Sequence, residues 1–86
     1  MKYIKHINES VEYGKIGNIR LMQQQIGSNY ILDFKNIGQV DFGMNKVLSE
    51  EVFEFVMKLK SLKLSDEVIF DKIKEYIRFF DIWLED

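Results

Sequence analysis

Two different hydrophobic periodicities divide this chain near its middle. In residues 1–43, short β-rich runs are separated by glycine-containing turn signals. In residues 46–86, apolar residues recur three or four positions apart, which is the spacing of one face of a helix. Strands that are followed by helices, and do not alternate with them, are typical of the α+β class. We therefore expect a single domain over residues 1–86, with a β-sheet half at 1–43 and a helical hairpin half at 46–86.

The first half predicts an antiparallel β-meander of three or four strands. The turn signals are Gly14-Lys15, Gly27-Ser28 and Asn36-Ile37-Gly38. The expected strands are Tyr3–Tyr13, Ile16–Ile26, Asn29–Lys35 and a short Val40–Phe42.

The register of the central hairpin stays open. A two-residue Gly27-Ser28 loop suits a type II′ turn and pairs Leu21 with Phe34. A three-residue loop that includes Asn29 pairs Met22 with Phe34 instead, which places the opposite face of the first strand toward the core. Both registers bury the same face of the second strand, formed by Tyr30, Leu32 and Phe34.

The second half predicts two helices packed on one face of the sheet. Ser49 and Ser65 are the expected N-caps, because each precedes acidic residues that suit the positive end of a helix dipole. The apolar stripe expected for the first helix is Val52, Phe55, Val56, Leu59 and Leu62. The stripe expected for the second is Ile69, Ile73, Tyr76, Ile77, Phe80 and Trp83, on a helix of 20 residues that is about 30 Å long.

The end of the second expected helix is apolar nearly all round. Between Tyr76 and Leu84, only Arg78 and Asp81 are polar, whereas a surface helix normally has one apolar stripe. One interpretation is that a broad sheet and the first helix bury all these side chains. The other is that some of them contact a second chain, because aromatic side chains often dominate binding energy. The second interpretation predicts these partner-binding residues: Phe79, Asp81, Ile82, Trp83 and Glu85.

We expect no catalytic, cofactor-binding or metal-binding residues. The chain has no cysteine, and His6 is its single histidine, so a zinc site would depend on carboxylates. Glu67, Asp71 and Glu75 share a helical face, which we expect to be solvated because it lies opposite the apolar stripe. The G-x-x-G run from Gly14 to Gly17 matches the loop of a nucleic-acid clamp, but such loops join helices and these flanks predict strands.

The amino-acid composition indicates which cellular compartment and which kind of partner to expect. A cysteine-free chain of 86 residues suits a reducing compartment, and no run of 18 apolar residues is present. We therefore expect a cytoplasmic protein that does not insert into membranes. The net charge of −2 argues against nucleic acid as a partner, because nucleic-acid binders usually carry a basic excess.

Residues 40–80 resemble a ribbon-helix-helix repressor. The resemblance consists of a short strand, a helix, a turn and a second helix that begins Ser65-Asp66-Glu67-Val68-Ile69. It implies a dimer that places paired strands in the major groove of DNA. The run Val40-Asp41-Phe42 departs from the pattern, because it offers an acid where bases are expected, and the turn between the helices has no glycine.

The sequence thus favours a small non-enzymatic protein-binding module over an enzyme. An inhibitor, immunity or accessory protein of a phage or other mobile element, which occludes a partner protein, is the interpretation we place first. The aromatic C-terminal segment suggests that the chain also pairs with itself as a homodimer, since symmetric pairing is common for small chains. The alternative is a dimeric DNA-binding regulator of the ribbon-helix-helix type.

Overall fold

The computed structural model of this protein describes residues 11–78 and 83–85. Its first hairpin joins β1 (Val11–Ile16) to β2 (Ile19–Gln23) in antiparallel register. The turn falls at Gly17-Asn18, where Gly17 takes a positive φ of 61° that a residue without a Cβ adopts at little cost. The predicted turn at Gly14-Lys15 is therefore wrong: Gly14 lies inside β1, next to an irregularity in pairing between Glu12 and Gly14.

The second hairpin joins β2 to β3 (Tyr30–Phe34) through a longer loop than either predicted register allows. Leu21 pairs with Leu32 and Gln23 with Tyr30, so both predicted registers are wrong. The loop is closed by the Gln24 N–H, which donates to the Asn29 carbonyl at 2.9 Å. The two-residue loop nevertheless predicts the correct faces, because its register differs by two positions and faces alternate with a period of two. Burial of Tyr30, Leu32 and Phe34 is confirmed.

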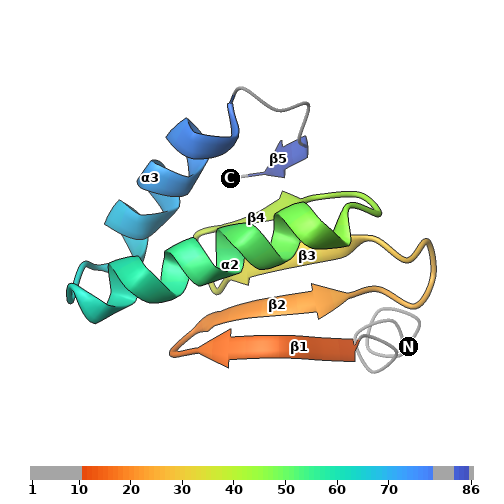
Figure 1. Cartoon of the computed structure of the whole chain (residues 1–86), viewed down its shortest axis with the longest axis horizontal. Coiled ribbons are helices and arrows are strands. Elements are labelled where there is room, and N and C mark those ends of the chain that lie inside the picture. Colours follow the sequence, from red (N-terminus) through yellow and green to blue (C-terminus); the bar gives the residue numbers. More distant parts are fainter. Residues whose placement is uncertain (1–10, 79–82, 86) are drawn as a thin grey trace.

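Two further strands complete a five-stranded antiparallel sheet. β4 (Gly38–Asp41) pairs with β3, and β5 (Trp83–Glu85) pairs with the other side of β4, so that the spatial order is β1-β2-β3-β4-β5 (Figure 1). The predicted meander followed by two helices is confirmed for β1–β4. The helical hairpin half at 46–86 needs one correction, because it ends in a strand that returns to the sheet.

The first helix, α2 (Lys46–Ser61), has its N-cap four residues before the predicted one. Asn45 is the N-cap, since its side chain accepts a hydrogen bond from the Leu48 N–H at 3.1 Å. Ser49 is buried inside the helix, where its hydroxyl donates to the Lys46 carbonyl at 2.7 Å. The stripe that faces the core shares Val52, Val56 and Leu59 with the predicted one, whereas Phe55 is only partly buried and Leu62 is exposed. The buried residues of this stripe are Leu48, Ser49, Val52, Phe53, Val56 and Leu59.

The second helix, α3 (Asp66–Ile77), is capped by Ser65, as the sequence predicts. The Ser65 hydroxyl accepts from the Val68 N–H at 3.3 Å. The helix ends at Ile77, with Arg78 as its C-cap, so the prediction of a 20-residue helix is wrong. Ile69, Phe70, Ile73 and Ile77 are its buried residues, whereas Tyr76 of the predicted stripe is exposed.

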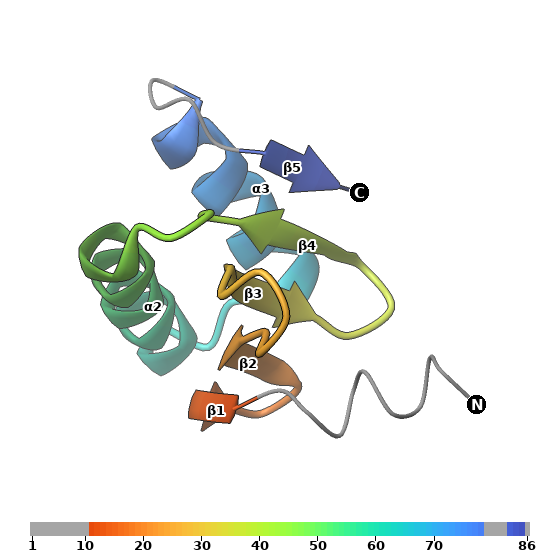
Figure 2. The same cartoon turned by 90° about the vertical axis from the view of Figure 1, so that its right-hand side faces the viewer.

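One hydrophobic core lies between the sheet and both helices. It joins alternate residues of β2, β3 and β4 to the buried stripes of α2 and α3. Figure 2 shows α2 lying along one side of the sheet, and Phe70 of α3 packs edge-on against Phe34 of β3 at a ring distance of 4.9 Å. No helix in the described part of the chain is long and apolar enough to cross a membrane.

Candidate functional site

The residues predicted to contact a partner are not brought together on one helix. Phe79, Asp81 and Ile82 lie outside the described residues. Trp83 and Glu85 lie on β5, where they stand opposite Asp41 and Gln39 of β4. The helical spacing that grouped Trp83 with the stripe of α3 therefore does not apply, because alternate residues share a face in a strand.

The carboxylates singled out on the second helix face solvent. Glu67, Asp71 and Glu75 are all exposed on α3, and Asp71 forms an ion pair with Lys74 at 3.5 Å. Within residues 11–78 and 83–85, no group of three His, Asp or Glu side chains is placed to hold a metal ion. His6 lies outside the described residues.

Strands flank the G-x-x-G run, as the sequence predicts. Gly14, Lys15 and Ile16 belong to β1, and Gly17 begins the turn to β2. Gly14 has a packing role in this position, because a Cβ built on it would lie 2.6 Å from Cε2 of Phe53. A side chain at this position would therefore force the Phe53 ring of α2 to shift.

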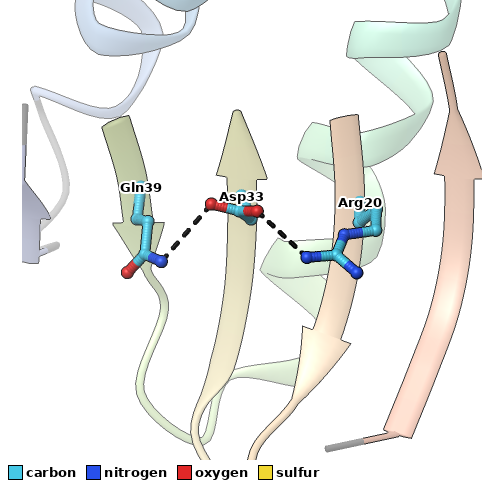
Figure 3. A network of polar contacts seen from close by, with 3 residues as sticks. All are labelled: Arg20, Asp33 and Gln39. Atoms are coloured by element: carbon cyan, nitrogen blue, oxygen red, sulfur yellow. Dashed lines mark hydrogen bonds and ion pairs between the residues drawn. The ribbon is translucent and has the colours of Figure 1, made fainter. Parts of the chain in front are cut away.

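The face of the sheet opposite the helices carries a polar network across three strands. The Arg20 guanidinium on β2 and the Gln39 amide on β4 both donate to the Asp33 carboxylate on β3, each at 3.3 Å (Figure 3). The three side chains lie in front of the strands in this view, with α2 behind them. The same face also carries the buried Ile31 of β3, opposite Met22 of β2.

A second surface lies where β1 passes the start of α2. The irregularity in β1 leaves Tyr13 between two pairing registers, and a bulge of this kind re-aims a side chain. The Tyr13 ring lies 5.8 Å from the buried Tyr30 ring and 5.7 Å from the Lys46 ammonium, and its hydroxyl donates to Gln23 Oε1 at 2.8 Å. Tyr13 is thus fixed on three sides and still 47% exposed.

Exposed apolar residues occur in the segments that hold this tyrosine. Val47, the second residue of α2, is 67% exposed, and Met44 in the preceding turn is 74% exposed. Val11 is also exposed and pairs with Gln23, the residue that accepts from the Tyr13 hydroxyl. We call Val11, Tyr13, Met44 and Val47 the Tyr13 surface.

The Tyr13 surface is not predictable from the periodicity of the sequence. Val47 lies off the apolar stripe, and the predicted start at Ser49 left it outside the helix. A signal was present: Val47 and Met44 are apolar residues beside Asn45, which is a favourable cap. Tyr13 was placed at the end of a predicted strand, and nothing local in the sequence reveals a bulge.

The segment that resembles a ribbon-helix-helix repressor does contain a strand and two helices. In that family, the strand pairs with the same strand of a second chain. Here β4 is flanked by β3 on one side and β5 on the other, so neither of its edges is free for a second copy. The structure therefore provides no ribbon of the kind the resemblance implies.

Comparison with known proteins adds no assignment: no family model, no curated protein and no solved structure matches this chain.

Proposed function

We propose that this protein is a non-enzymatic protein-binding module that acts by occluding a surface of another protein. The observation that carries the proposal is the Tyr13 surface. Its exposed apolar side chains come from two elements that are far apart in the sequence and adjacent in the fold. Partner-binding patches typically combine aromatic and methionine side chains of this kind with a polar rim.

Single exposed apolar side chains are common on folded proteins, so their grouping matters more than their number. Met44 is linked to Lys46 by a backbone hydrogen bond of 3.0 Å, and Lys46 lies over the Tyr13 ring. Tyr13 in turn reaches Gln23, the cross-strand partner of Val11. The three other residues of the surface therefore belong to the segments whose Lys46 and Gln23 hold the Tyr13 ring.

The fixed position of Tyr13 indicates a residue that binds a partner, and not one that is exposed without a function. A side chain that is already held in one arrangement loses little conformational entropy when a partner covers it. Tyrosine also offers a broad apolar ring together with a polar hydroxyl, which is why it is enriched at interfaces. Lys46 and Gln23 supply polar groups beside the ring.

The proposal is tested with Val47→Asp and a matched control, Val68→Asp. Both valines are exposed and both lie in the first turn of a helix, where an acid suits the helix dipole. Both variants should therefore fold as the parent does. A photo-crosslinker placed at Met44 should capture a defined host protein, and Val47→Asp should abolish that capture whereas Val68→Asp retains it.

Light scattering on the purified chain identifies the partner as a second copy or a different protein. A dimer that Val47→Asp dissociates and Val68→Asp leaves intact means that the chain uses this surface on itself. Equal capture by both variants and the parent, together with an unchanged molecular mass, would overturn the assignment of the Tyr13 surface.

A further inference from the structure

A hollow of about 280 Å³ lies at the end of the sheet where β1 turns into β2. Four residues line it: Lys15 on β1, Arg20 on β2, Asn18 in the turn between them, and Lys35 directly after β3. Three of the four are cations, in a chain whose net charge is −2. The hollow is separate from the Tyr13 surface, which lies toward the other end of the sheet.

The backbone pairing brings these cations together. Lys15 and Arg20 are direct cross-strand partners, and like charges in that position destabilise a sheet. The third cation is held near the same turn, because the Lys35 N–H donates to the Asn18 carbonyl at 3.4 Å. The repulsion between these like charges lowers the stability of the folded chain, and a bound anion would offset it.

The cations outnumber the carboxylates around them. Asp33 pairs with Arg20 at 3.3 Å, but it also accepts from Gln39, so its charge is shared. Lys15 and Lys35 are exposed, and neither forms an ion pair with any carboxylate in residues 11–78 and 83–85. Among the described residues, the hollow therefore contains three cations and is bordered by one carboxylate.

We propose that this hollow binds a compact anion of the phosphate class, either free phosphate or a phosphate monoester of a small molecule. The planar donor fork of arginine matches the oxygens of a phosphate group, and lysines add point charges that need no fixed geometry. The Asn18 amide supplies a neutral donor. A single recess with three cations fits one phosphoryl group better than an extended polyanion, which would need a row of cations along its length.

The test is a titration of the ¹⁵N-labelled chain, followed by NMR, with inorganic phosphate in one arm and phenyl phosphate in the other. Sodium chloride at matched pH and ionic strength is the reference. We expect saturable shifts of the Lys15–Arg20 and Lys35 amides in the phosphate arms, with α3 unaffected. Equal affinity in both arms identifies the phosphoryl group alone as the ligand, and tighter phenyl phosphate binding identifies a monoester.

Single variants distinguish binding of phosphate in the hollow from non-specific attraction of phosphate to surface lysines. Lys15→Gln and Lys35→Gln should each weaken phosphate binding about tenfold, because each removes one charge-assisted hydrogen bond. Lys72→Gln removes an exposed lysine on α3 and should leave the affinity unchanged. Without phosphate at low salt, Lys15→Gln should melt no lower than the parent, because it relieves the Lys15–Arg20 repulsion.

Three outcomes would each overturn the proposal. They are shifts that increase linearly without saturation, shifts that chloride reproduces at equal ionic strength, and an affinity that falls equally in Lys72→Gln and Lys15→Gln. The melting temperature offers an independent check, since a ligand that binds only the folded chain must raise it, and must continue to raise it with the logarithm of ligand concentration above the dissociation constant.

Discussion

Gly14 shows how a missing side chain makes room for a buried aromatic ring. The contact between β1 and α2 leaves no room for a Cβ, because Phe53 already occupies that space. Gly14→Ala should lower the free energy of unfolding by about 1–3 kcal/mol, which is the usual cost of overpacking. Phe53→Leu in the same chain should recover part of that loss in a double-mutant cycle by chemical denaturation. Gly43→Ala is the control: a Cβ there meets nothing within 4 Å, so Phe53→Leu should not change its cost.

The observed cap of α2, Asn45, and the predicted cap, Ser49, should differ in how much each side chain stabilises the fold. Asn45→Ala should cost about 1 kcal/mol, because it removes the acceptor for the Leu48 N–H. Ser49→Ala should change stability by less than about 0.5 kcal/mol, because it removes a hydroxyl that bonds only within its own helix and leaves the packing intact. Urea midpoints of the two variants check this order. A larger loss for Ser49→Ala would restore Ser49 as the cap.

At the scale of elements, the buried face of α2 includes Phe53, whereas the sequence pattern predicted Phe55. Phe53 is 9% exposed and belongs to the core cluster, whereas Phe55 is half-buried beside Tyr76 at a ring distance of 5.4 Å. Phe53→Ala should therefore cost about 3–5 kcal/mol. Phe55→Ala should cost less, about 1–2 kcal/mol, because its ring loses an aromatic contact and only part of its burial. Thermal melts compare them, and a larger effect for Phe55→Ala would contradict the helix placement.

The elements also show which parts of the fold the sequence could predict. The capped start of α3 was predictable, since Ser65 precedes two acids and a clear stripe. The end of α3 was not, because no glycine or proline lies between Ile77 and Trp83 to mark it. An apolar run that no glycine or proline interrupts is consistent with a buried strand as well as with a buried helix. The strand β5 forms because β4 offers an edge to pair with, and that edge is invisible in the local sequence.

For the whole molecule, the core face of β3 was more predictable than the partners of its residues. The alternation of Tyr30, Leu32 and Phe34 identifies the core face in any register. The register itself depends on a loop of positive-φ residues, Gly27 and Ser28, whose length the turn signals understate. The candidate sites were hidden for the same reason. The Tyr13 surface and the cation-lined hollow both join residues that only the finished sheet brings together.

The distribution of charge over the whole molecule predicts weak binding to DNA. The cations of the hollow form one compact group, so few phosphates can be neutralised at once, and affinity for DNA depends on that number. The net charge of −2 adds repulsion, and β4 has no free edge with which to form a ribbon for the major groove. A gel shift at physiological salt should therefore give a dissociation constant weaker than about 1 μM, the range of non-specific binding. Duplexes of different sequence should bind alike, and Lys15→Gln should weaken the residual binding more than Lys72→Gln. Submicromolar binding that distinguishes one sequence from another would instead require a DNA-reading surface outside the described residues, and would make the chain a regulator.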